Sequence, residues 1–246
     1  MEKTAKRPNP RRGIYLLPNL LTTGALFAGY YAITSAIAGR YETAVIAIFI
    51  AMILDGLDGR VARLTNTQSE FGVQYDSLSD MTSFAVAPAL VMYLWAFTGM
   101  GKLGLFAAFI HIAGGALRLA RFNTQVGTAD RRYFQGLASP AAAAILAGFI
   151  WISVEHEYPI DLVKYPALVL TISTGLLMVS NFRYYSFKET DFRGKVPFVV
   201  AISVMLVVGF VMTQPENMLF LLALGYAVSG PVVTLIMRKR LQERKL

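Results

Sequence analysis

Runs of about 20 apolar residues, separated by short polar breaks, recur along the whole chain. A helix needs about 20 such residues to cross the roughly 30 Å hydrocarbon core of a bilayer. The pattern predicts an all-α, polytopic integral membrane protein and excludes a soluble globular domain. By this measure we expect about eight transmembrane helices, at approximately residues 15–38, 43–62, 77–98, 103–121, 138–154, 165–181, 196–213 and 217–237.

The Lys and Arg residues are distributed unevenly between the two ends of these spans. All but Arg40, Lys102 and Lys164 of the 23 fall on one side. Because loops rich in Lys and Arg stay in the cytoplasm, that side is predicted to be cytoplasmic, and an even number of spans puts both termini there. The expected location is the cell (inner) membrane. The basic residues stand at loop ends, so the net charge of +8 indicates contact with anionic membrane lipids and no nucleic acid.

No linker or break in composition divides the chain, so one membrane domain is predicted over residues 15–237. A basic N-terminal segment, 1–14, precedes it, and a basic tail, 238–246, follows it. The chain has no cysteine, which excludes disulfides and thiolate chemistry.

Four aspartates, Asp55, Asp58, Asp76 and Asp80, lie at the ends of the second and third predicted spans. A carboxylate inside the membrane costs roughly 2.5 to 3.5 kcal/mol, so four cost on the order of 10 kcal/mol unless something neutralises them. Spacings of three and four residues put each pair on one face of its helix. Only a short polar connection separates the two helices, so they are predicted to be antiparallel neighbours whose aspartates form one site.

Oxygen ligands without His or Cys favour a hard cation, Mg²⁺ or Mn²⁺, and four carboxylates are enough for two such ions. Gly56, Gly59 and Gly72 would let a ligand approach the backbone closely, and Arg63 is placed to reach a phosphate. These features together indicate a site for a nucleotide diphosphate. Buried carboxylates also serve as relays in cation or proton transporters, which stays an alternative from another functional class.

The same residues carry a family resemblance. Their pattern is D, two residues, DG, two residues, AR, eight residues, G, three residues, D, three residues, D, and it is formed by Asp55, Asp58, Gly59, Ala62, Arg63, Gly72, Asp76 and Asp80. It resembles the signature of the CDP-alcohol phosphotransferase family at every fixed position. The resemblance implies transfer of a phosphatidyl group from a CDP-linked lipid to an alcohol, with release of CMP.

The resemblance also implies roles for individual residues. Asp55, Asp58 and Asp76 would bind two divalent cations, and Asp80 would be both a metal ligand and the general base. Asp55, Gly59, Ala62, Arg63 and Gly72 would line the CDP pocket. The stretch 17–22 is similar to the family's first-helix entry, which adds Asn19 and Thr22 as candidate CDP contacts. A homodimer with a catalytic core at about 15–181, and two additional helices at 196–237, is expected on the same ground.

The acceptor alcohol is suggested by two other stretches. GGALRLARFN (114–123) and YFQGLASPAAAA (133–144) resemble the phosphatidylserine synthase branch, although Ala138 stands where that branch has proline. This implies CDP-diacylglycerol and L-serine as substrates, with glycerol 3-phosphate or inositol as alternative acceptors. The candidate acceptor-binding or phosphate-binding residues are Arg118, Arg121, Asn123, Gln135 and Ser139.

Two of these candidates have further interpretations. Arg118 and Arg121 are three residues apart, so both can face a phosphate or the serine carboxylate, or they can anchor a helix end at the membrane surface. His111, in the same predicted span, is expected to be packed between helices or to lie at the membrane interface rather than to bind a ligand.

Overall fold

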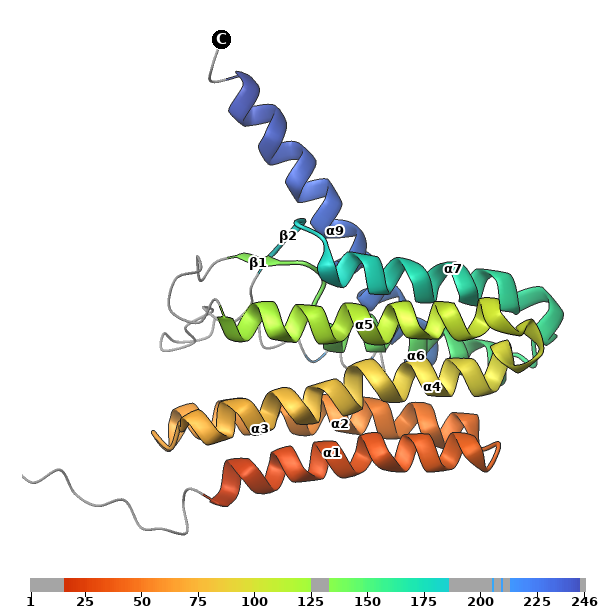
Figure 1. The fold of residues 1–246 in the computed structure, drawn as a ribbon, viewed down its shortest axis with the longest axis horizontal. Coiled ribbons are helices and arrows are strands. Elements are labelled where there is room, and N and C mark those ends of the chain that lie inside the picture. The colour runs from red at the N-terminus through yellow and green to blue at the C-terminus, as the bar shows by residue number, and fades with distance from the viewer. Residues whose placement is uncertain (1–15, 125–132, 186–204, 206–208, 210–212, 244–246) are drawn as a thin grey trace, which may run out of the picture.

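Long helices lying side by side make up most of the computed structural model, which describes residues 16–124, 133–185, 205, 209 and 213–243 (Figure 1). The α-helices are α1 (Leu16–Ile37), α2 (Tyr41–Leu64), α3 (Glu70–Asp80), α4 (Ala87–Met92), α5 (Lys102–Thr124), α6 (Ser139–Glu155), α7 (Ile160–Val179) and α9 (Pro215–Glu243). The π-helical segment Met81–Val86 joins α3 to α4. A second π-helical segment, Tyr93–Phe97, and a 3₁₀ turn, Thr98–Met100, follow α4, so that residues 70–100 form one helical rod.

Five of the described helices are long and apolar enough to cross a membrane: Leu16–Ile37, Glu70–Met100, Lys102–Thr124, Ile160–Val179 and Pro215–Ile236. The prediction of an all-α polytopic membrane protein is therefore confirmed. α2 has 24 residues but carries the charged groups of the motif, and α6 has 17 residues. The seventh predicted span, 196–213, lies outside the described residues except at three positions, as does the segment 1–14, so the number eight stays a prediction.

Small side chains set the distance between the helices. α1 packs along α2, α5 along α7, and α6 against both α2 and α9. The core between them contains many fully buried alanines, among them Ala32, Ala44 and Ala51, together with larger groups such as Ile48 and Phe84. In a membrane, where neighbouring helices gain little from the hydrophobic effect, such close backbone contact supplies much of the attraction between them.

The rod over 70–100 begins seven residues before the predicted span. The Ser69 side chain caps it by accepting a hydrogen bond from the Gly72 N–H (3.0 Å), and Glu70 stands in the first turn, where a negative charge is favourable. The polar residues of α3 extend the helix beyond its apolar part, so that Asp76 stands on a regular helix, as its spacing from Asp80 had predicted.

A short two-stranded pairing, which the sequence had not indicated, connects distant parts of the chain. β1 (Tyr133–Gln135) pairs antiparallel with β2 (Arg183–Tyr185), with Phe134 opposite Tyr184. Hydrogen bonding between segments 50 residues apart leaves no local periodicity in the sequence, so the apolar pattern does not predict this pairing.

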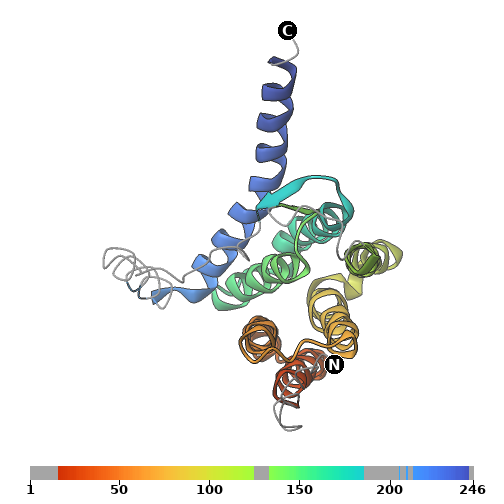
Figure 2. The same ribbon diagram turned by 90° about the vertical axis from the view of Figure 1, so that its left-hand side faces the viewer.

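α9 is tied to this pairing by Tyr184. Burial raises the pKa of Tyr184 to about 12, so its hydroxyl keeps its proton and donates to the carbonyl of Ala227 (3.0 Å). Pro231 leaves that carbonyl without the helical N–H four residues ahead of it. The ring of Tyr184 fills the place where a side chain at Gly230 would stand. Figure 2 shows α9 crossing the other helices and projecting beyond them, and it continues through 238–243 into the segment expected as a tail.

Candidate metal centre and substrate cavity

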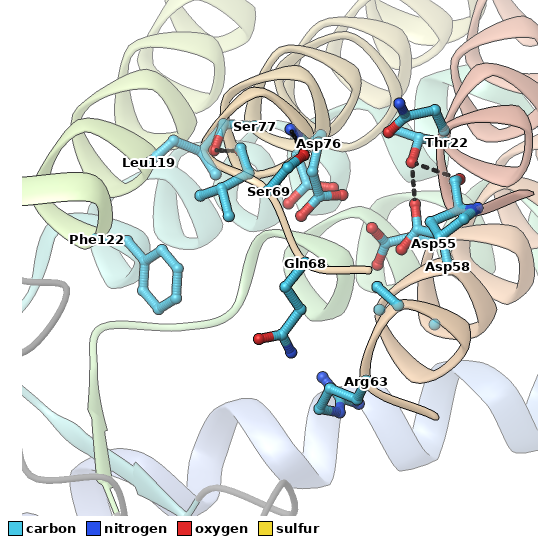
Figure 3. A pocket seen from close by; sticks show the side chains of 18 of the residues that line it. Thr22, Asp55, Asp58, Arg63, Gln68, Ser69, Asp76, Ser77, Leu119 and Phe122 are labelled. Atoms are coloured by element: carbon cyan, nitrogen blue, oxygen red, sulfur yellow. Dashed lines mark hydrogen bonds between the residues drawn. The ribbon is translucent and has the colours of Figure 1, made fainter. Parts of the chain in front are cut away.

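Three carboxylates from two antiparallel helices meet at one end of the bundle. Asp55 lies near the end of α2, and Asp76 and Asp80 lie one turn apart on α3. One oxygen from each of the three lies within 4.8 Å of the others, and all three side chains are partly buried. Asp55 and Asp76 point into the same space in Figure 3. The structure therefore confirms that α2 and α3 bring carboxylates together, with three of the four aspartates in one group.

The fourth aspartate, Asp58, faces a different helix. The Thr22 hydroxyl of α1 donates to Asp58 Oδ2 at 2.5 Å (Figure 3), and Asp58 is 4% exposed. Asp58 is not part of the three-carboxylate group, although it lines the same cavity. Its role as a metal ligand stays a prediction. The contact links α1 to the motif, and Thr22 was expected to contact CDP rather than a carboxylate.

The three-carboxylate group fits a hard divalent cation. Like charges held this close repel one another, and burial makes each charged form more costly. Asp80 Oδ1 is buried and has no hydrogen-bond partner among the described residues. Carboxylate oxygens are the ligands that Mg²⁺ and Mn²⁺ prefer. The group can therefore bind a divalent metal ion, which would remove the repulsion and occupy the unsatisfied oxygen.

A cavity of about 510 Å³ opens beside these carboxylates. A Cβ added to Gly56 would meet no atom within 4 Å, so this stretch of the α2 backbone borders open space. The cavity is lined by all eight residues of the motif and by three of the other candidates, Asn19, Thr22 and Arg118.

Arg118 of α5 also borders the cavity. Its Nη1 donates to the Ser139 hydroxyl at 2.8 Å, which fixes the guanidinium across the start of α6. Its Nε is buried and has no hydrogen-bond partner among the residues described. Arg118 also interacts electrostatically with Asp55 and Asp80. The cavity is therefore lined by carboxylates and by the guanidinium groups of Arg63 and Arg118.

The other four predicted acceptor residues do not line the cavity. Arg121 donates to the carbonyls of Val179 (3.0 Å) and Ser180 (3.4 Å), so it supplies hydrogen-bond donors to carbonyl groups at the C-terminal end of α7. The Asn123 amide donates to Ser77 (3.1 Å) and so connects α5 to α3. Ser139 is fully buried and holds Arg118, whereas Gln135 lies exposed in β1.

Several lining residues were missed by the sequence analysis. Thr67, Gln68 and Ser69 come from the α2–α3 connection, and Phe122 comes from α5. Phe122 had a usable signal, because it lies one helical turn after Arg118 and so shares its face. The connection residues had none, since their position depends on how α2 ends and α3 begins.

Comparison with known proteins agrees with this arrangement. A family model described as CDP-alcohol phosphatidyltransferase matches residues 15–229. A Helicobacter pylori protein named CDP-diacylglycerol–serine O-phosphatidyltransferase is 37% identical over 198 residues, which cover 80% of this chain and 84% of that protein. One of the same name from Methanocaldococcus jannaschii is 37% identical over 184 residues (74% and 80%). An archaetidylserine synthase from Methanothermobacter thermautotrophicus is 34% identical over 170 residues (68% and 69%).

Proposed function

Because the chain belongs to the CDP-alcohol phosphatidyltransferase family, we propose that it transfers the phosphatidyl group of CDP-diacylglycerol to the hydroxyl of L-serine, giving phosphatidylserine and CMP. The observation that carries this proposal is the group of three carboxylates beside a cavity that Arg118 also borders. The names of the relatives support serine as the acceptor. Family membership also favours this chemistry over a cation or proton transporter.

In the proposed reaction, a bond forms between the serine oxygen and the phosphorus that carries diacylglycerol. The bond from that phosphorus to the oxygen of CMP breaks, and CMP leaves with the electron pair. Asp80 accepts the proton of the serine hydroxyl. It borders the cavity and has a buried oxygen without a hydrogen-bond partner among the described residues, which supports this role.

Two divalent cations, Mg²⁺ or Mn²⁺, are proposed to be bound by Asp55, Asp76 and Asp80, with Asp58 as a further ligand. When bound, they would supply positive charge that stabilises the phosphate oxygens as CMP leaves. The CDP group is proposed to occupy the part of the cavity bordered by Asn19, Gly59, Ala62, Arg63 and Gly72. The lack of side chains at the two glycines supports close approach of a flat or extended ligand to the backbone.

Arg118 is proposed to bind the serine carboxylate. A guanidinium and a carboxylate form short, charge-assisted hydrogen bonds, and Arg118 borders the cavity. Ser139 acts on the substrate only through Arg118, as the residue that holds its Nη1. Arg121 and Asn123 are proposed to support the cavity wall through their bonds to α7 and α3.

The acceptor is tested with purified protein, CDP-diacylglycerol and Mn²⁺ or Mg²⁺, following CMP release with serine, inositol or glycerol 3-phosphate in parallel. Of the three acceptors, we expect only serine to give CMP release. No CMP with any of the three would overturn the proposed activity, and release with another acceptor would overturn the choice of serine.

In the same assay, Arg118→Gln should raise KM for serine about tenfold and KM for CDP-diacylglycerol much less. The reverse pattern would assign Arg118 to the donor phosphate.

We further propose that the protein acts as a homodimer in the cell (inner) membrane, with the cavity open to the cytoplasm. Support for the orientation comes from the basic residues near the cavity, such as Arg60 and Arg63, compared with Arg40, Lys102 and Lys164 at the opposite end. The family resemblance supports the dimer, which crosslinking in native membranes would test.

The orientation can be tested by cysteine labelling, since the chain has no cysteine of its own. Glu155 ends α6, Glu70 begins α3, and both side chains are exposed. We expect a membrane-impermeant maleimide to label Glu155→Cys in intact cells, and Glu70→Cys only after the membrane has been opened. The opposite result would invert the proposed topology.

A further inference from the structure

His111 is a fully buried polar side chain for which the proposed reaction has no use. It lies in α5, is 0% exposed and does not border the cavity. Its Nδ1 lies 2.9 Å from the Thr174 hydroxyl of α7, and its Nε2 lies 3.4 Å from the carbonyl oxygen of Phe84. A polar group inside a membrane bundle is costly unless its hydrogen bonds are made, so its two partners need explaining.

The Phe84 carbonyl is a backbone acceptor without its usual donor. In a regular α-helix it would accept from the N–H of residue 88, and Pro88 has no N–H. The helix responds by widening over Met81–Val86, where the Ala87 N–H donates to the Thr82 carbonyl five residues back. Such π-helical turns and neighbouring side chains are the means by which membrane helices satisfy the groups that a proline releases.

The protons of His111 can be assigned from its partners. A carbonyl oxygen only accepts, so the contact with Phe84 requires a proton on Nε2. In a ring with one proton, Nδ1 then accepts, and the Thr174 hydroxyl directs its single proton to Nδ1 rather than to the Thr171 carbonyl, which lies 3.0 Å from it. The chain of contacts therefore runs from α7 through His111 to the widened turn. Its last link, at 3.4 Å, is at the long end of the hydrogen-bond range.

The widened turn begins directly after Asp80, so its geometry fixes how Asp80 is presented. From the α1 side the turn is held by the Ser83 hydroxyl, which donates to the Ala25 carbonyl at 3.0 Å. From the α5 side it is held by His111 and by close packing of Gly115 against Ala85, where an added Cβ would come within 2.5 Å.

We propose that His111 is a positioning residue for Asp80: by donating Nε2–H to the Phe84 carbonyl, it fixes the π-helical turn that orients the Asp80 carboxylate towards the other two. This role rests on the proposed function, in which Asp80 binds metal and accepts the serine proton. His111 itself contacts neither substrate nor metal.

Two conservative variants separate the contacts of the ring. The amide of His111→Gln can put an N–H donor near the place of Nε2, whereas that of His111→Asn reaches only the place of Nδ1. Mn²⁺ affinity of the purified protein, measured from the electron paramagnetic resonance of free Mn²⁺, serves as a readout besides activity. We expect the Gln variant to keep both Mn²⁺ affinity and kcat, and the Asn variant to lose about tenfold in each.

His111→Phe, which fills the site without a donor, should behave like the Asn variant, and KM for serine should change little in all three. His156→Asn is the matched control, because His156 lies exposed at the opposite end of the bundle. Equal Mn²⁺ affinities of the Gln and Asn variants, whether kept or lost, would overturn the proposal even if the Phe variant failed to fold. If the wild-type protein released no CMP, the proposed function would fail, while the comparison of Mn²⁺ affinities would still test the positioning role.

Discussion

Replacing Asp80 by Asn is expected to lower the rate of CMP release by at least about 10³-fold, which corresponds to roughly 4 kcal/mol of lost transition-state stabilisation. The amide has the same shape but cannot accept the serine proton, and it removes one negative charge from the three-carboxylate group. Binding of CDP-diacylglycerol should fall much less, because Asn19, Gly59 and Arg63 border the cavity without help from Asp80. Turnover is measured with serine and Mn²⁺, and lipid binding is measured separately.

The matched control for this substitution is Asp161→Asn. Asp161 lies at the opposite end of the bundle, is exposed, and pairs with Lys164 at 2.6 Å. Exposed pairs of this kind contribute little to stability, so both rate and folding should remain near wild type. A normal rate in the Asp80→Asn protein would remove Asp80 from the role of general base.

A second large effect is expected from Gly114→Val, which acts on folding rather than on chemistry. A Cβ at Gly114 would overlap the backbone carbonyl of Gly175, and a Cβ at Gly175 would meet the backbone of Ile110. Since backbone atoms cannot turn aside as a flexible side chain can, α5 and α7 would have to separate. We expect a loss of about 3 kcal/mol in stability and a fall in Tm of roughly 10 °C in detergent.

Gly225→Val in α9 provides the matched control, because no atom lies within 4 Å of the added Cβ. Its Tm should stay close to that of the wild-type protein. The Gly114 variant should also lose activity, because the same separation would pull Thr174 away from His111, which lies two turns before Arg118 on α5. An unchanged Tm in the Gly114 variant would show that α5 and α7 do not approach each other this closely.

The motif predicted that carboxylates of α2 and α3 converge, because that geometry is local, whereas the roles of these residues stay predictions. Helical spacing puts Asp76 and Asp80 on one face whatever surrounds them, and a short connection makes α2 and α3 antiparallel neighbours. The acceptor side was harder. Arg118 and Arg121 share a helix and a charge, but one borders the cavity while the other satisfies the carbonyl groups at the end of α7. Which of them faces the cavity depends on the packing of α5 against α6 and α7, and residue spacing carries no information about that packing.

The boundaries of the helices follow the same division. Apolar runs located α1, α5 and α6 to within about three residues, because their ends coincide with the ends of the apolar stretches. α3 and α7 begin earlier than hydropathy indicates, at Glu70 and Ile160, because a helix can extend past the membrane when its first turn is satisfied by caps or water. The pairing of β1 with β2 is a long-range contact, and the apolar pattern is silent about it.

The bond between Tyr184 and the Ala227 carbonyl suggests a way to obtain long-range restraints from sequence. An internal proline marks, four residues earlier, a backbone oxygen that the helix itself cannot satisfy. Where that oxygen lies inside the bundle and the helix does not adjust locally, another segment can bring a donor to it, as Tyr184 does from 43 residues away. Where it lies at an end, as for Pro166 with Leu162 in the exposed first turn of α7, water suffices. In a membrane chain, each deeply placed proline thus identifies one half of a tertiary contact, and the nearby Tyr, His, Ser or Thr residues are the candidates for the other half.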